Sequence, residues 1–331
     1  MQQSDIKLKE NYYLALTDAD SIIHSSAAYI QDNFILAKHT ESGKAKEFKN
    51  ITAFREWLKN TPKGRKQKEE NFTFETKPRL NASVSKALAT IDLKIKAIMK
   101  EPWCKDIKIF VGGKGNYRKD LDPLYKSSRP DKPIAFKACY DYVINKYKDK
   151  VIICDGEEAE DRVGIEAYAD WTNAQGDFDK LTTVVCAIDK DVDMIPSLRY
   201  NYQKPKLGVY PIDDRYALSC FHKQMLMGDS TDDIKGLDYH PEALTSVYKI
   251  NKKGLGESSA LGILEGAESS QEELRRVVHA YQLAYGEEWV AKANLAAQML
   301  LIRRIDNQMF DIRDACQELG VDYEGMLNAE G

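Results

Sequence analysis

The sequence lacks the features that mark several classes of protein. No apolar run is long enough to span a membrane, and the first residues, MQQSDIKLKENYY, lack the basic-then-apolar order and the cleavage site of a signal peptide. The six cysteines include no CxxC pair, which argues against a zinc site, and Cys154 and Cys186 lie within apolar runs, where buried, reduced thiols are expected. We therefore expect a protein of the cytoplasm without a membrane partner.

A large net charge is also lacking, because 48 Lys and Arg stand against 52 Asp and Glu. Although the total charges nearly balance, acidic and basic residues are concentrated in different parts of the chain. Residues 59–79 and 114–137 each hold seven basic against three acidic residues, whereas residues 154–193 hold twelve acidic against three basic ones. Two basic tracts beside an acidic pocket suit a polyanion that is held by its backbone and attacked at a phosphate. The alternative is two solvated basic loops.

The acidic residues come in bursts that follow apolar runs. One burst follows VIIC, another follows TVVCAI, and smaller ones follow YYLAL and lie in MGDSTDDIKGL. Short apolar runs indicate buried strands, and ligands collect at the carboxyl ends of parallel strands. Since neighbouring carboxylates repel each other, a hard divalent cation is the usual compensation. Any one burst could be a solvated loop or a helix N-cap, but four on separate segments favour a metal site.

The order of apolar patterns predicts an α/β protein. Strands are expected at residues 12–16, 107–111, 151–154 and 183–188, and the helical patterns between them predict a mostly parallel central sheet with helices on both faces. Beyond about residue 214 the patterns are helical only. We therefore expect an α/β domain over residues 1–213 and a helical region over residues 214–331.

Five blocks in this order resemble the flap endonuclease/5'-exonuclease family of PIN-like nucleases, especially its bacteriophage members and the related phage ribonucleases H. The blocks are the acid after the first strand, GGKGNYRKDLDPLYKSSR, EEAEDRVG, AIDKDVDMIP, and GDSTDDIKGL with GLGESSALGIL, and they span most of residues 12–265. The resemblance implies a monomeric nuclease of the host cytoplasm that uses two Mg²⁺ or Mn²⁺ ions. Its implied substrates are 5' ends or flaps of DNA and RNA–DNA hybrids in phage-type replication.

The resemblance also implies roles for individual residues. One metal-binding set would comprise Asp18, Glu158 and Glu160, and the other Asp161, Asp189, Asp191, Asp229 and Asp232. A helical gateway around residues 118–150 would place three phosphate-holding cations, Arg118, Lys126 and Arg129. Tyr125 would stack on a terminal base, with a packing role as the alternative.

A helix-three-turn-helix motif around residues 228–265 is implied as well. Its turn would bind duplex DNA, with K⁺ as a candidate ion, through Gly254, Gly256, Ser258 and Ser259. An ordinary helix C-cap at GLG is the alternative.

One departure from the family pattern concerns an acid expected after the second strand. The chain has Gly113 there, or Gly112 if the alignment is shifted by one. Either a water replaces that carboxylate, or the first metal binds weakly, or activity is lost. Two other functions therefore stay open. One is a haloacid-dehalogenase-type phosphohydrolase with Asp18 as nucleophile, and the other is an impaired protein that binds DNA structures without cutting them.

Overall fold

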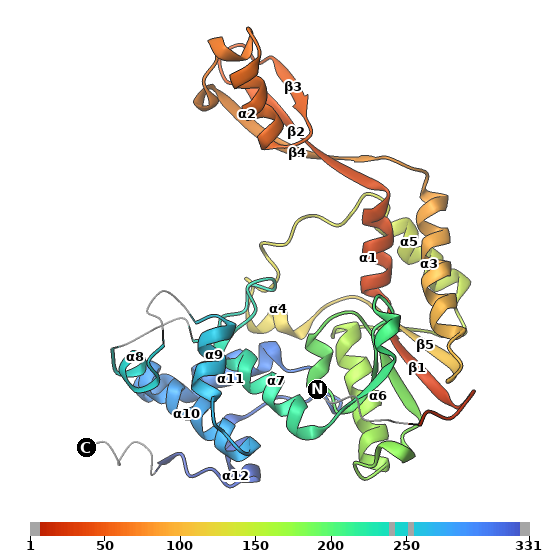
Figure 1. Ribbon diagram of the computed structural model, residues 1–331, viewed down its shortest axis with the longest axis vertical. Helices are drawn as coiled ribbons and strands as arrows, with labels where there is room; N and C mark the ends of the chain where they lie inside the picture. Colours follow the sequence, from red (N-terminus) through yellow and green to blue (C-terminus); the bar gives the residue numbers. More distant parts are fainter. Residues whose placement is uncertain (1–6, 238–241, 251–254, 325–331) are drawn as a thin grey trace. The chain divides into compact units, whose positions relative to one another are not determined.

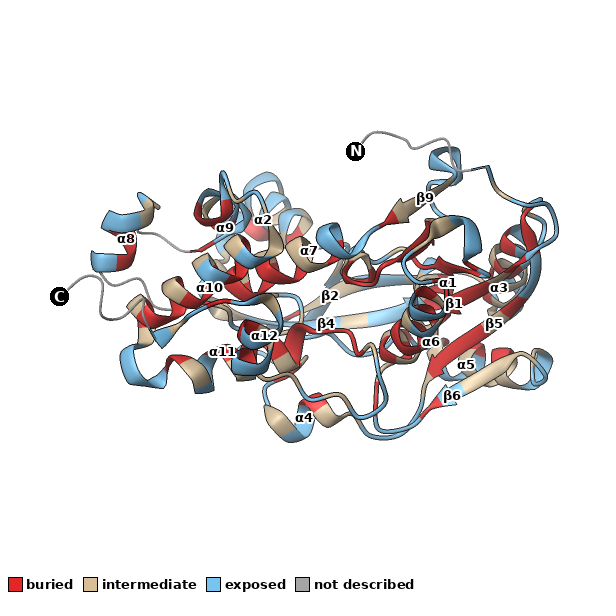
Figure 2. Cartoon of the chain, turned by 90° about the horizontal axis from the view of Figure 1, so that it is seen from below, coloured by how far each residue is buried: buried red, intermediate tan, exposed pale blue. Residues whose placement is uncertain are grey.

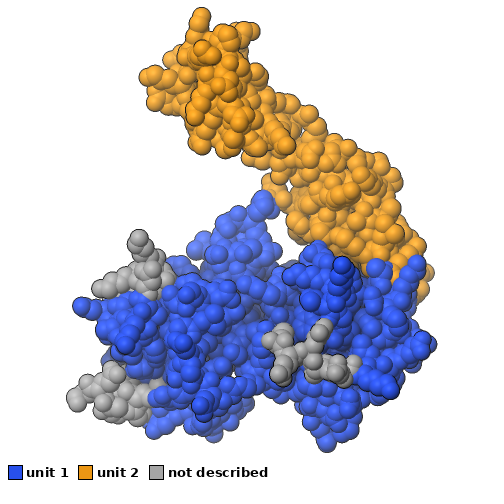
Figure 3. Space-filling view, viewed as in Figure 1, with its two compact units in different colours: residues 1–20, 97–130, 150–331 blue, residues 21–96, 131–149 orange. Residues whose placement is uncertain are grey.

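The computed structural model describes residues 7–237, 242–250 and 255–324. The chain forms two compact units, which Figure 3 distinguishes by colour. The first unit consists of Met1–Asp20, Ala97–Pro130 and Lys150–Gly331, and the second of Ser21–Lys96 and Asp131–Asp149. The first unit thus contains the helical C-terminal part and the rest of the predicted α/β domain of residues 1–213, whereas residues 21–96 and 131–149 of that domain form the second unit.

A six-stranded sheet forms the centre of the first unit, in the order β6-β5-β1-β7-β8-β9. All neighbouring strands are parallel except β9, which runs antiparallel to β8. Parallel strands are buried on both faces, which explains their continuous apolar runs and the burial of β1 and β5 (Figure 2). The predicted, mostly parallel sheet is confirmed. The strands are β1 (Tyr13–Asp18), β5 (Cys104–Gly112), β6 (Val151–Cys154), β7 (Thr183–Cys186), β8 (Ser197–Tyr200) and β9 (Val209–Ile212).

Helix α6 (Ala159–Asn173) covers the face of this sheet that matters for the site (Figure 1). Its Val163 packs in one buried cluster with Leu16 of β1 and Phe110 of β5. Asp18 is the register partner of Phe110, and side chains alternate along a strand, so Leu16 and Asp18 share this face. The packing therefore directs the last residue of β1 toward the N-terminus of α6.

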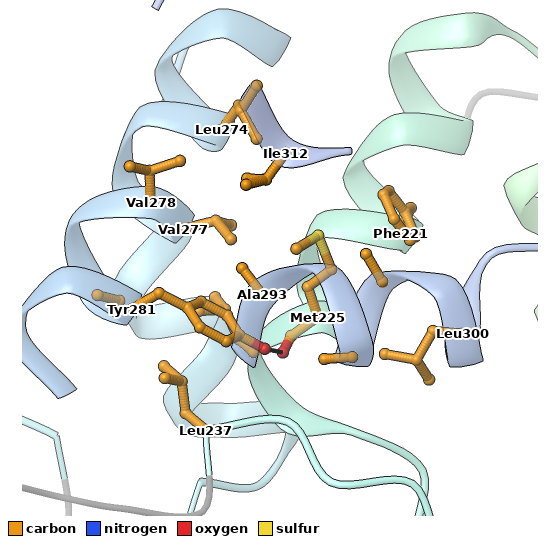
Figure 4. Close-up of a cluster of buried hydrophobic side chains, with 14 of the residues drawn as sticks. Phe221, Met225, Leu237, Leu274, Val277, Val278, Tyr281, Ala293, Leu300 and Ile312 are labelled. Carbon is orange, nitrogen blue, oxygen red and sulfur yellow. Dashed lines mark hydrogen bonds between the residues drawn. The ribbon is translucent and has the colours of Figure 1, made fainter. Parts of the chain in front are cut away.

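The C-terminal part of the first unit is helical, as predicted. Its buried core includes Phe221, Met225, Leu274, Val277 and Tyr281, whose hydroxyl donates to the carbonyl of Met225 at 2.6 Å (Figure 4). No helix in the described part of the chain is long and apolar enough to cross a membrane. The helices are α7 (Asp214–Met227), α8 (Glu242–Tyr248), α9 (Glu257–Leu264), α10 (Ser270–Tyr285), α11 (Trp289–Leu300) and α12 (Ile312–Leu319), and the short α4 (Tyr117–Leu121) precedes them in the chain.

The second unit contains a small antiparallel sheet that the sequence patterns did not predict. Its order is β3-β2-β4, and an aromatic cluster around Phe54 and Trp57 packs on it. Strands β3 and β4 are mostly exposed and polar, and only β2 contains a short apolar run, FILA, which is partly buried, so the apolar signal of a buried sheet is weak here. The elements are α1 (Asp20–Tyr29), β2 (Gln31–His39), β3 (Ala45–Phe48), α2 (Ile51–Asn60), β4 (Phe72–Leu80), α3 (Val84–Met99) and α5 (Phe136–Lys146), with α1 and α3 continuing into the first unit.

Candidate active site at the strand ends

A first carboxylate group consists of Asp18, Glu158 and Glu160. Asp18 ends β1 and is only 3% exposed, and Glu160 lies in the first turn of α6. Burial raises the pKa of Glu160 well above its ordinary value, and the charges of Asp18, Asp189 and Glu158 raise it further. These acids therefore act on one another although they come from separate segments of the chain.

A second carboxylate group consists of Asp189, Asp191 and Asp229. Burial, followed by the charges of Asp189 and Asp229, raises the pKa of Asp191 to about 7. The amide of Gln224 on α7 donates to Asp191 Oδ1 at 2.5 Å, and the backbone N–H of Asp191 donates to Asp189 Oδ1 at 3.1 Å. Acids from the loop after β7 and from the loop after α7 thus lie close enough for their like charges to affect each other, and their role as metal ligands stays a prediction.

Two cations lie against these groups. Lys126 Nζ forms an ion pair with Glu158 and lies 3.3 Å from Asp232 Oδ2, and Arg129 pairs with Asp232. Burial opposes the charge of Lys126, but the charges of Glu158 and Asp232 outweigh it and raise the pKa of Lys126. Glu158 is likewise kept ionised, because Lys126 and Arg118 lower its pKa against the effect of burial. The cations partly neutralise the acidic pocket.

Arg118 and Asp161 occupy different positions from those of the other site residues. Both are buried, and Arg118 holds Asp161 through two hydrogen bonds of 2.6 and 2.9 Å. The backbone N–H groups of Glu158 and Arg303 each donate to Asp161 at 3.1 Å. Four donors fill the accepting capacity of a carboxylate. In this structure Asp161 and Arg118 satisfy each other, whereas the sequence had assigned them to a metal ion and a phosphate.

Tyr125 is also buried, with 2% of its surface exposed. Its hydroxyl lies 2.9 Å from Glu158 Oε2 and 3.2 Å from Asp232 Oδ2. This buried position agrees with a packing role for Tyr125, which the sequence offered as the alternative to base stacking. Stacking on a base stays a prediction, and it requires the ring to become accessible.

A small cavity of about 20 Å³ separates the carboxylate groups, which is roughly the space that one water molecule occupies. Among the described residues, no three His, Cys, Asp or Glu side chains are arranged closely enough to hold a metal ion. The donor chemistry nevertheless fits a hard cation, because the cavity lining supplies carboxylate oxygens, and such cations prefer oxygen ligands. The lining includes Arg118, Tyr125, Glu158, Glu160, Asp191, Asp229 and Asp232.

Among the described residues of the GLG motif, Gly256 lies at the start of a helix and not at the end of one. Gly256 is the N-cap of α9, and the N–H of Ser259 donates to its carbonyl at 3.0 Å, while Ser258 is exposed. Gly254 lies outside the described residues. Gly256 borders a second cavity of about 290 Å³, which is also lined by Lys190, Asp229 and Thr231. The helix N-terminus predicted for phosphate binding is therefore present, and its role stays a prediction.

Gly113 does not offer the place for the expected acid. A β-carbon there would lie 2.2 Å from Asp155 Oδ1 and 2.8 Å from the carbonyl of Cys154. Asp155 is held in that position by the N–H of Lys114, which donates to it at 2.6 Å. Of the two positions that the sequence left open for the acid, residue 113 would therefore place a β-carbon against Asp155 and the backbone of Cys154, whereas Gly112 lies on the face of Asp18.

Sequence reasoning missed two polar side chains that contact the acids. The amide of Asn116 donates to Glu158 Oε1 at 3.0 Å, and Gln224 contacts Asp191 as described above. Asn116 lies inside the GGKGNYR block, so its proximity to the quoted motif was an available signal. Gln224 lies in the middle of α7, where nothing in the local pattern distinguishes it.

No family model and no curated protein matches this sequence. The fold is similar to solved structures from bacteriophage T5. The T5 D15 protein, crystallised with metal ions, is 16% identical with a TM-score of 0.41, covering 74% of this chain and 92% of that one. A mutant T5 5'-exonuclease is 15% identical with a TM-score of 0.39, covering 74% and 91%. The T5 D15 flap endonuclease in a pseudo-enzyme-product complex with DNA and metal ions is 12% identical with a TM-score of 0.35, covering 73% and 91%. This likeness concerns the fold alone.

Proposed function

We propose that this chain is a divalent-metal-dependent 5' nuclease, a phosphodiesterase that cuts 5' ends and flaps of DNA and RNA–DNA hybrids in phage-type replication. The observation that carries the proposal is the pair of carboxylate groups at the strand ends. Burial and then the charges of neighbouring acids raise the pKa values of Glu160 and Asp191, and the cations Lys126 and Arg129 lie beside them. Such a site can bind divalent cations and a phosphate together.

Oxygen-only ligands suit Mg²⁺ or Mn²⁺. The first carboxylate group would hold one ion, and the second group, with Asp232, would hold another. Two divalent ions supply stabilisation of both the attacking and the leaving oxygen of a phosphodiester. Bound cations would also offset the burial and the repulsion that raise the pKa values of Glu160 and Asp191.

Lys126 and Arg129 would hold the scissile phosphate. In the structure their charges are directed to Glu158 and Asp232, so they already lie at the edge of the acidic pocket. Once cations neutralise these acids, both side chains can turn to a phosphate and stabilise charge that develops on it. Arg118 would act indirectly, because its guanidinium is committed to Asp161.

Duplex DNA would be held away from the cleavage site by the N-terminus of α9. The exposed Ser258 and the backbone of Gly256 and Ser259 can approach a phosphate there, and K⁺ is a candidate ion beside the adjoining cavity. Backbone contacts of this kind carry no sequence information, so binding would be non-specific. We further propose that the protein acts as a monomer in the cytoplasm of a host cell.

Digestion of 5'-labelled flap, nicked and RNA–DNA substrates with Mg²⁺ and with Mn²⁺ tests the proposal. The parent should release 5' fragments, and Asp189→Asn and Asp191→Asn should bind DNA while cleaving it orders of magnitude more slowly. Ordinary turnover by both variants would rule out the two-metal assignment. Tight binding of flapped DNA without cleavage by the parent would indicate a structure-binding protein, and a trapped aspartyl-phosphate on Asp18 would indicate a phosphohydrolase.

A further inference from the structure

The carboxylate of Asp20 takes the place of a side chain at residue 112. The backbone N–H of Gly112 lies 3.1 Å from both Asp20 oxygens. A β-carbon added to Gly112 would lie 2.8 Å from Asp20 Oδ2, closer than real β-carbons approach. Gly112 does not have a positive φ, so its backbone conformation alone does not require glycine. In the structure the Asp20 carboxylate instead occupies the space that a β-carbon at residue 112 would take.

This carboxylate lies next to the first carboxylate group. The backbone N–H of Asp20 donates to Asp18 Oδ1 at 2.9 Å. Gly112 is two residues beyond Phe110, the register partner of Asp18, so Gly112 and Asp18 are on one face of the sheet. After burial and Glu157, the charges of both Asp20 and Asp18 contribute to raising the pKa of the Cys154 thiol at the end of β6. Asp20 thus adds a negative charge where β1, β5 and β6 end together.

We propose that Asp20 is an additional ligand of the ion held by Asp18, Glu158 and Glu160, supplying from the start of α1 the carboxylate that strand β5 lacks at Gly112. This inference rests on the proposed function. On this inference, the acid that the family has at the end of the second strand is supplied by Asp20 of α1. The first ion then keeps this carboxylate ligand, and no water molecule has to replace it.

A purely structural role for Asp20 predicts different results. Asp20 is the first residue of α1, where an acid interacts favourably with the helix dipole. Asparagine retains the hydrogen-bonding oxygen that Gly112 contacts and is tolerated at helix starts, but it has no charge to offer a cation. Asp20→Asn therefore separates the two roles, since it preserves the local structure and weakens only metal binding.

Mn²⁺ binding to the full chain without DNA, followed by electron paramagnetic resonance and calorimetry, tests the inference. Asp20→Asn should bind the first Mn²⁺ at least about tenfold more weakly, with unchanged thermal unfolding in EDTA. Asp20→Ala should do the same, and the double variant Asp20→Ala with Gly112→Asp should regain most of the affinity, because the carboxylate is returned to the strand end. Asp18→Asn is the positive control for the first site.

The outcomes distinguish the inference from the function on which it rests. Parent-like Mn²⁺ affinity in Asp20→Asn, together with weakened binding in Asp18→Asn, would overturn the role of Asp20 and leave the metal site intact. A parent that binds no Mn²⁺ would contradict the proposed function itself. If Asp20→Asn unfolds, Gly112→Ala is the second variant. Its β-carbon must displace the Asp20 carboxylate, so unchanged Mn²⁺ affinity in Gly112→Ala would also overturn the inference.

Discussion

Arg118 and Asp161 form a buried, bidentate ion pair that joins the short helix α4, which follows β5 in the chain, to the start of α6. Arg118 also donates to the carbonyls of Met299 and Leu301, both at 2.8 Å, at the end of α11. The pair therefore connects the strand-end loops to the helical C-terminal part within the first unit. Both residues lie beside the candidate site. Because they bind each other, we expect them to stabilise the structure around the site and not to contact a substrate or an ion directly.

Removing one partner of this pair should destabilise the fold. Asp161→Asn leaves the Arg118 guanidinium buried without a counter-charge, which typically costs about 3–5 kcal/mol in the free energy of unfolding. Urea unfolding in EDTA measures this change. Asp189→Asn is the matched control, because Asp189 is exposed and its loss should leave stability unchanged or raise it. Equal stability of the two variants would show that the ion pair does not support the fold.

Lys126 and Arg129 should affect the chemical step more than binding. If they stabilise charge on the phosphate in the transition state, Lys126→Ala and Arg129→Ala should each slow single-turnover cleavage by about 10²- to 10³-fold at saturating enzyme. Lys119→Ala removes an exposed cation from α4 and should cleave at the parent's rate. If both test variants cleaved at the parent's single-turnover rate, Lys126 and Arg129 would have no role in the chemical step.

Gly113→Asp should destabilise the protein without improving metal affinity. The new β-carbon would have to displace Asp155 and move away from the backbone carbonyl of Cys154, a group with little freedom to shift. Thermal unfolding in EDTA and an Mn²⁺ titration check both parts of this prediction. A stable variant with tighter Mn²⁺ binding would show that residue 113, and not residue 112, faces the first carboxylate group.

Asp92 should make the stability of the second unit depend on acid pH. The hydroxyls of Tyr147 and Tyr142 on the segment around α5 lie 2.8 and 3.0 Å from its carboxylate, and Lys146 forms an ion pair with it. Burial raises the pKa of Asp92, but these partners outweigh burial and lower it. The stabilisation is therefore fully present above the unfolded-state pKa of about 3.9 and is lost as pH falls through the lower folded-state value.

The comparison of Asp92→Asn with the parent tests this dependence. The variant should be about 2 kcal/mol less stable at neutral pH, since hydrogen bonds to a charged group are lost. The difference should shrink below about pH 4, where the parent's carboxylate also becomes protonated. Urea unfolding between pH 7 and pH 3 measures it, and a difference that stays constant over this range would contradict the assignment.

Ser258→Glu should weaken duplex binding without affecting the fold or the intrinsic cleavage step. A carboxylate at the N-terminus of α9 would repel the phosphate proposed to bind there. Fluorescence anisotropy of a labelled duplex at several salt concentrations should show weaker binding than for the parent, especially at low salt. Gln317→Glu adds the same charge to an exposed position of α12 and serves as control. Equal binding by both variants would place the duplex elsewhere.

Local sequence determined the central sheet and the acids at its ends. The run TVVCAI is continuous because β7 is covered on both faces, and the short run VIIC revealed the edge strand β6, which is only partly buried, by its apolar character alone. The acids that follow them are one or a few residues away, which is within reach of a local pattern. The small sheet β3-β2-β4 left a weaker signal, because β3 and β4 are largely exposed and the packing of the sheet depends on aromatic residues from α2.

Only the tertiary structure decided which partner each acid has. Asp161 meets Arg118 across 43 residues, and Asp20 meets Gly112 across 92 residues, so no spacing rule could separate these acids from their neighbours. The same bursts of Asp and Glu contain a buried ion-pair member, a helix-start residue and the exposed Asp189. Sequence by itself determined where negative charge accumulates, because strand ends follow from local apolar patterns. The path of the backbone determined how that charge is compensated, because charge interactions depend on distances and burial that arise only when remote segments pack together.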